Sequence, residues 1–153
     1  MLQTIQARAD MNENPSALIR TLTFAGVTPF IMAPMMKVGW IVLPGIAPDT
    51  WLWGYAVVIG AFVAGAQWGS GLHYRDAPSL AGSYFSALAV FALALWGRTP
   101  AGVLALAVLF AAQLLLDHHQ HRLGLISTGY WRLRCTITPL VCITLVIYAR
   151  VAG

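Results

Sequence analysis

The side chains that could do chemistry gather at one end of the helices that the sequence predicts. They form the candidate polar cluster Gln67, Trp68, His73, Asp117, Trp131 and Arg134. An ionisable group at the margin of a membrane span is costly unless it is paired, so Asp117 needs a partner. Arg134, across a short loop, is the first choice. Such a pair is most simply a structural lock between two helices, and the alternative is a pocket for a ligand headgroup.

The histidine-rich run from Asp117 to Arg122 raises the question of a metal or a haem. Helices that bind metals place histidines three or four residues apart, and only His118 and His121 meet that spacing. No cysteine or second carboxylate stands at a suitable spacing. A haem between membrane helices takes a histidine from each, and no histidine lies deep in a predicted span. We predict no metal and no cofactor, with His118 and His121 as the alternative metal ligands.

The composition predicts a membrane protein. Of 153 residues, 59% are hydrophobic and only 9% are charged, against roughly one quarter charged in soluble domains. Several apolar runs approach about 20 residues, the length that crosses a hydrocarbon core. The net charge of +4 comes from lysines and arginines spread singly over the ends of these runs, which orients helices and does not indicate nucleic-acid binding.

The fold that we predict is all-α: a polytopic membrane protein with a five-transmembrane-helix bundle. A polar N-terminal tail, 1–15, precedes one transmembrane domain, 16–151. Its spans are expected at about 16–36, 51–72, 79–96, 100–117 and 131–151. The first span contains Pro29 and Pro34, so a kink is expected near the run TPFIMAP. The segment that follows, 38–49, is too short to cross and should lie at the interface.

The second span carries two stripes of small residues spaced by four. One is Ala56, Gly60 and Ala64, and the other is Ala61, Gly65 and Gly69. Because small residues let helices approach closely in lipid, we expect both stripes to pack against protein.

The distribution of basic residues gives an orientation. With the amino terminus in the cytoplasm, that side carries Arg8, Arg20, Arg75, Arg122, Arg132 and Arg134, and the other side carries Lys37, Arg98 and Arg150. Six against three favours a bacterial inner-membrane protein with a cytoplasmic N-terminus and a periplasmic C-terminus. The polar cluster then lies at the cytoplasmic end of the bundle.

Three runs resemble an uncharacterised family of multi-pass membrane proteins, domain of unknown function 3429, which includes the transmembrane protein 69-like proteins. They are LTFAGVTPFI (22–31), YAVVIGAFVAGAQWG (55–69) and LLLDHHQHRLGLISTGYWRLRCTIT (114–138). The resemblance implies a multi-span protein of bacterial or mitochondrial inner membranes with no assigned activity. Family members often have His before the tryptophan of the second run. Gln67 stands there in this chain, so a proton-transfer role is not carried over.

The sequence favours a non-enzymatic protein, since it contains none of the common catalytic or nucleotide-binding motifs. We expect an accessory or assembly subunit that packs against a larger membrane complex, with the lipid bilayer and other membrane-protein subunits as partners. The alternative is a binder or carrier of a small amphipathic ligand, a quinone, haem or lipid, at the cytoplasmic end of the bundle.

Overall fold

The computed structural model describes residues 17–96 and 98–152, and every regular element in them is an α-helix. Five stretches are long and apolar enough to cross a membrane, the first of which, Ala17–Lys37, is made of two helices. The predicted all-α bundle of five membrane-crossing helices is therefore confirmed. The N-terminal tail expected at 1–15 lies outside the described residues. The helices are α2 (Ala17–Ala25), α3 (Thr28–Lys37), α4 (Pro48–Tyr74), α5 (Ala77–Trp96), α6 (Pro100–Arg122) and α7 (Thr128–Ala152).

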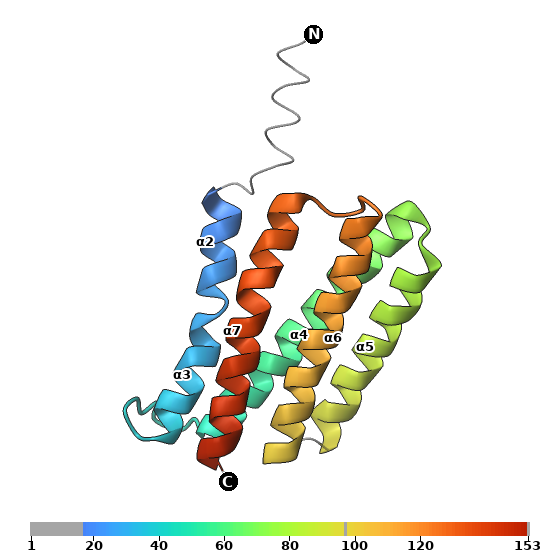
Figure 1. Cartoon of the computed structure of the whole chain (residues 1–153). Helices are drawn as coiled ribbons and strands as arrows, with labels where there is room; N and C mark the ends of the chain where they lie inside the picture. The colour runs from blue at the N-terminus through green and yellow to red at the C-terminus, as the bar shows by residue number, and fades with distance from the viewer. Residues whose placement is uncertain (1–16, 97, 153) are drawn as a thin grey trace.

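From α3 to α7 the helices form a ring of contacts in which each packs against its neighbours in sequence. Figure 1 shows α4 crossing obliquely behind α7 and α6. Helix α7 returns to α2 and α3 and closes the ring, and α4 and α6 also touch across it. Helix α2 begins at the end of the bundle where α4 ends, and α7 ends at the opposite end (Figure 1). The side chains on the facing surfaces of α4, α6 and α7 are therefore brought together.

The first span bends, and it does so just before the run TPFIMAP, between α2 and α3 at Gly26 and Val27. Pro29 stands at the start of α3, where its missing N–H removes a hydrogen bond to the preceding turn. Pro34 lies inside α3 and does not end it. The kink therefore has the expected cause in Pro29, but it falls at the residues that precede it.

Side chains of α4 bond the carbonyl groups at and just after this bend. The Tyr55 hydroxyl donates to the carbonyl of Gly26 at 2.7 Å, and the Trp51 indole donates to the carbonyl of Pro29 at 3.0 Å. The Phe30 ring meets the Tyr55 ring edge to face at 5.1 Å and the Phe110 ring at 5.8 Å. These contacts attach the bent first span to α4 and α6.

The two small-residue stripes of α4 have different surroundings. Ala56, Gly60 and Ala64 are buried as expected, and a Cβ atom on Gly60 would lie 2.9 Å from Val90 of α5. The other stripe is exposed, and a Cβ atom on Gly65 or Gly69 would have no neighbour within 4 Å. Within this chain, the prediction that both stripes pack against protein holds only for the first. The ring of five helices leaves the outer face of α4 uncovered.

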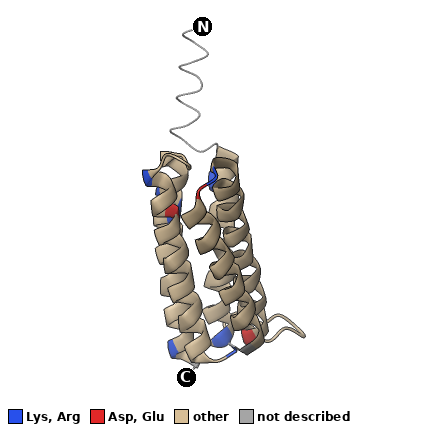
Figure 2. Ribbon diagram, turned by 90° about the vertical axis from the view of Figure 1, so that its right-hand side faces the viewer, with Lys and Arg blue, Asp and Glu red and all other residues tan. Residues whose placement is uncertain are grey.

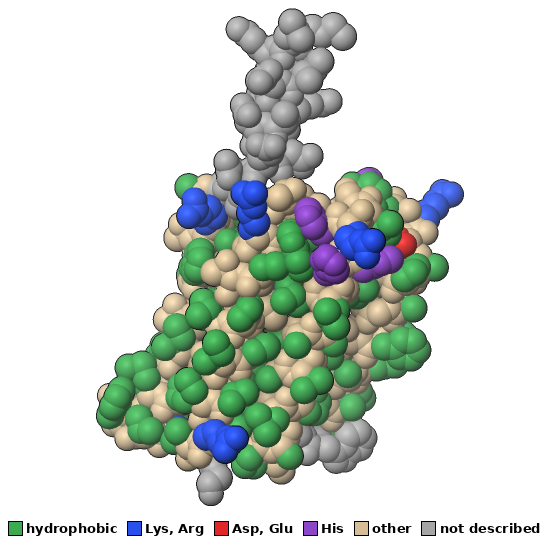
Figure 3. Space-filling model, in the orientation of Figure 1, with side chains coloured by type: hydrophobic (Ala, Val, Ile, Leu, Met, Phe, Trp, Pro, Cys, Tyr) green, Lys and Arg blue, Asp and Glu red, His purple; other side chains and the backbone are tan. Residues whose placement is uncertain are grey.

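Large apolar side chains cover the outside of the bundle between its two ends (Figure 3). Phe62 is 72% exposed, Leu115 72% and Phe85 66%. The described lysine, arginine and acidic residues lie near the two ends of the ribbon (Figure 2). This is the distribution that a hydrocarbon layer imposes on a chain that crosses it. Between α3 and α4, the non-helical segment exposes Trp40 and Val42, as an interfacial segment would.

Candidate functional site

The site is built around the carboxylate of Asp117 on α6, whose residue is 1% exposed. One oxygen, Oδ2, accepts a hydrogen bond from Arg134 Nε of α7 at 2.6 Å. The other, Oδ1, accepts from Gln67 Nε2 of α4 at 2.7 Å. The ion pair expected between Asp117 and Arg134 is therefore present, and Gln67 adds a third helix to it.

Three glutamine side chains extend this pair into a buried polar network between α4 and α6. Gln67 Nε2 also donates to the carbonyl of Gln113 at 2.7 Å. Gln113 Nε2 donates to the carbonyl of Gly60 at 3.0 Å, and Gln120 Nε2 donates to the carbonyl of Gln67 at 3.1 Å. All three glutamines are at most 2% exposed. Side chains thus fasten the two helices to each other inside the bundle.

The polar cluster predicted from the sequence contains neither Gln113 nor Gln120. Gln113, Asp117 and Gln120 follow each other at intervals of four and three, which places them on one helical face. That spacing was the signal that could have found the complete row. His121, four residues after Asp117, lies outside the network, and its ring stacks on the Trp131 ring with the two centroids 5.6 Å apart.

Several polar atoms of the network are buried without a hydrogen-bond partner among the described residues. They include Oε1 of Gln67, Oε1 of Gln113 and Nη2 of Arg134. A buried donor or acceptor that is left unpaired costs about 1–3 kcal/mol. The network therefore holds the ion pair and still has unused hydrogen-bonding capacity on both the donor and the acceptor side.

Two hollows lie on either side of the ion pair, and Tyr130 lines both. The first, which we call the apolar cavity, has a volume of about 420 Å³ and lies between the first span and helices α4, α6 and α7. The second, the polar pocket, has a volume of about 250 Å³. Arg134 lines the apolar cavity, and Asp117 lines the polar pocket. The polar pocket is lined by Ala66, Gln67, Ser70, Asp117, Gln120, Ile126, Ser127 and Tyr130.

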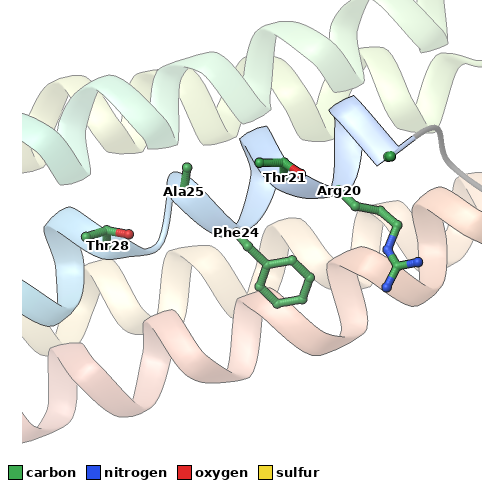
Figure 4. A pocket seen from close by; sticks show the side chains of 6 residues that line it. Arg20, Thr21, Phe24, Ala25 and Thr28 are labelled. Carbon is green, nitrogen blue, oxygen red and sulfur yellow. The ribbon is translucent and has the colours of Figure 1, made fainter.

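A third hollow lies against α2 and the start of α3. Its labelled lining residues, among them Arg20 and Phe24, all come from this one stretch of chain (Figure 4). Because no other described part of the chain contributes to its lining, this hollow is an open surface.

The other predicted cluster residues lie outside the network. Trp68 is 43% exposed, and His73 is exposed with its ring edge to face on Tyr74. Trp131 packs against the rings of His118 and His121 instead of contacting Asp117. The structure thus joins Gln67, Asp117 and Arg134 and separates them from the three aromatic members of the cluster.

The histidines near this end of α6 have different partners. The His119 ring lies 3.2 Å from Asp76 Oδ2, and Ser79 N donates to the same oxygen at 3.0 Å. Hydrogen bonding by Ser79, with a smaller contribution from His119, lowers the pKa of the Asp76 carboxyl. Within residues 17–96 and 98–152, no three His, Cys, Asp or Glu side chains come together as a metal-binding group.

A family model matches residues 15–150, almost the whole chain, and its description is protein of unknown function (DUF3429). The chain belongs to this family. No curated protein and no solved structure matches the chain. As a DUF3429 protein with five apolar helices of membrane-spanning length, the chain has the character of a multi-pass membrane protein in a family whose description assigns no activity.

From the buried ion pair we predict how substitutions of Asp117 and Arg134 change the free energy of unfolding. Asp117→Leu alone leaves the Arg134 guanidinium buried without a counter-charge, and Arg134→Leu alone strands the carboxylate, so each should lower the free energy of unfolding by about 3–5 kcal/mol. The double variant removes both charges and should recover most of that loss. Unfolding in detergent, followed by circular dichroism, measures the cycle. Two single losses that simply add in the double variant would contradict the coupling.

Proposed function

We propose that this protein binds a neutral amphipathic ligand of the quinone type in the apolar cavity, with the carbonyl end of the ligand near Arg134. The single observation that carries the proposal is the position of Arg134. It lines a cavity that is otherwise almost entirely apolar, and its Nη2 has no acceptor within the described part of the chain. A ligand oxygen would satisfy that donor.

The polar groups of the apolar cavity are few. Thr23 bonds the carbonyl of Ile19 in its own helix, which leaves Tyr130, Arg134 and Thr138 as the polar residues of the lining. Thr138 is 3% exposed, and its hydroxyl has no partner among the described residues. An apolar cavity with a small number of polar groups is typical of a site for a small organic ligand. The lining residues are Ile19, Leu22, Thr23, Gly26, Phe30, Ile59, Phe62, Val63, Phe110, Tyr130, Arg134, Ile137, Thr138 and Val141.

The rim of the cavity supports entry from the bilayer. Phe62 of α4 and Leu22 of α2 both line the cavity and are 72% and 63% exposed. In a membrane these two side chains contact hydrocarbon, so a ligand dissolved in lipid reaches the cavity between α2 and α4 without crossing water.

Charge favours a neutral ligand over an anionic one. Asp117 already neutralises Arg134 at 2.6 Å, so a phosphate entering beside them would bring an uncompensated negative charge into a medium of low dielectric. A quinone carbonyl accepts a hydrogen bond and brings no charge. Haem is less well supported than a quinone, because no His, Cys or Met is among the described residues that line the cavity.

Filling the cavity should weaken ligand binding. Val63→Phe places a ring in the apolar cavity and should weaken the affinity for a short-chain ubiquinone analogue at least tenfold, while Thr138→Val, which removes one hydroxyl, should weaken it about fivefold. Titration calorimetry of the detergent-purified protein measures both. The matched control is Val58→Phe, the same change at a site of α4 that is 63% exposed. Equal affinity in Val63→Phe and the wild type would remove the proposal.

A second candidate function is that of an accessory or assembly subunit of a larger membrane complex. It is favoured by the exposed stripe of Ala61, Gly65 and Gly69 on α4, since small residues let a helix of another protein approach closely in lipid. A side chain on Gly65 meets nothing within the bundle.

This second candidate makes its own prediction. Gly65→Leu should leave the melting temperature unchanged and should remove any subunit that co-purifies with the wild type at native expression in mild detergent. Val58→Leu, on the exposed surface of the same helix, is the control. A wild-type protein that migrates alone, or a subunit that stays bound to Gly65→Leu, would count against an accessory role.

We further propose a bacterial inner membrane as the location, with the end that holds Asp117 toward the cytoplasm. The basic residues support this orientation. The end with the histidines carries Arg20, Arg75, Arg122 and Arg132, and Figure 3 shows several basic side chains there. The other end carries Lys37, Arg98 and Arg150, so the first end has more basic residues.

A further inference from the structure

A separate hollow lies at the opposite end of the bundle from Asp117. It has a volume of about 130 Å³, which is room for a few water molecules or one small ion. Helices α3, α4, α6 and α7 each contribute to it, and it shares no residue with the apolar cavity or the polar pocket. Its lining residues are Lys37, Asp49, Leu52, Trp53, Arg98, Thr99, Pro100, Val103 and Tyr148.

The charges around this hollow leave an excess of one positive charge. Lys37 Nζ lies 3.1 and 3.2 Å from the two carboxylate oxygens of Asp49, and the Tyr148 hydroxyl donates to the same carboxylate. Asp49 is therefore neutralised by its own partners. Arg98 forms no ion pair within residues 17–96 and 98–152, so its charge is uncompensated.

A buried donor in the lining has no acceptor. Trp53 is 4% exposed, and its indole N–H finds no hydrogen-bond partner among the described residues. Tryptophan that is buried normally satisfies this N–H, so the orphaned donor requires an explanation. An acceptor in the adjacent hollow would supply one.

The N-terminus of α6 adds a further positive element. Thr99 is its N-cap and accepts a hydrogen bond from Gly102 N at 3.1 Å, so its hydroxyl proton remains available to a ligand. The 23-residue helix that follows presents the positive end of its dipole here. The unused groups around the hollow are thus a guanidinium, an indole N–H, a hydroxyl and a helix N-terminus, all of which favour negative charge.

We propose that this hollow binds a phosphate group, held by Arg98, the indole N–H of Trp53 and the N-terminus of α6. The site lies at an end of the membrane-crossing helices, where lipid headgroups would be, so the phosphate group belongs either to free inorganic phosphate or to a membrane lipid. Both carry the oxygen acceptors and negative charge that the lining requires. This site is independent of ligand binding in the apolar cavity.

The experiment uses the full-length protein in a detergent without phosphorus. Titration with inorganic phosphate, followed by tryptophan fluorescence, tests the free ion. Native mass spectrometry after addition of phosphatidylglycerol tests the lipid. Arg98→Gln removes the charge, and Trp53→Phe keeps an aromatic ring while removing the N–H. Each should weaken binding about tenfold or more, because each removes a donor to a charged group. Because Trp53 is itself a fluorophore, calorimetry with inorganic phosphate replaces fluorescence for Trp53→Phe.

The control is Arg150→Gln. Arg150 stands in the last turn of α7, at the same end of the bundle as the hollow, and it does not line the hollow. It should bind within about twofold of the wild type. Phosphate binding that depends on Arg98 identifies the free ion, and lipid binding alone with the same dependence identifies a headgroup; both support the site. If neither ligand binds, or if Arg98→Gln binds as Arg150→Gln does, the proposal is overturned. Arg98 is exposed, so its substitution leaves the folded bundle available for this comparison.

Discussion

Polar groups inside this bundle depend on one another, because a hydrocarbon layer offers them no water. Asp117 illustrates the constraint most fully: both of its oxygens are bonded by side chains, one from α4 and one from α7. An ionised group in this position is tolerated when it is paired and hydrogen-bonded. The positions of α4, α6 and α7 relative to one another follow from this requirement, as do the glutamine bonds that fasten α4 to α6. These three helices are members of the ring of contacts, which α3 and α5 complete.

The break in the first span lies beside the apolar cavity. The carbonyl of Gly26, at the break between α2 and α3, accepts a hydrogen bond from Tyr55 of α4, and the carbonyl of Pro29 accepts one from Trp51 of α4. Gly26 at the break and Phe30 just after it both line the apolar cavity. The bend and the cavity therefore adjoin each other.

The sequence alone predicted the features that depend on the length of the apolar runs and on the small number of charged residues. Five apolar runs of membrane-crossing length dictate five helices, and a chain with few charges offers Asp117 few partners besides Arg134. The rotation of each helix about its axis was not predictable in this way. Gly60 and Gly65 occur in equivalent stripes, yet one is buried against Val90 and the other is exposed. The same limit explains why Trp68 and His73, close to Gln67 in sequence, face away from the network.

The two ends of the bundle differ in chemistry. One end holds the ion pair of Asp117 and Arg134 together with four histidines and several arginines. At the other end, a lysine, an aspartate and a tyrosine form a compact group beside Arg98, which forms no ion pair among the described residues. This asymmetry fits a protein that meets different surroundings on the two sides of a membrane.

The central claim is that the chain crosses a membrane five times, which gives the buried network its hydrocarbon surroundings. Reporters fused to each terminus test it most directly: a fluorescent protein that folds only in the cytoplasm and a phosphatase that is active only outside it. Five crossings from a cytoplasmic N-terminus would give fluorescence from the N-terminal fusion and phosphatase activity from the C-terminal fusion. Both termini on the same side would require an even number of crossings and would contradict it.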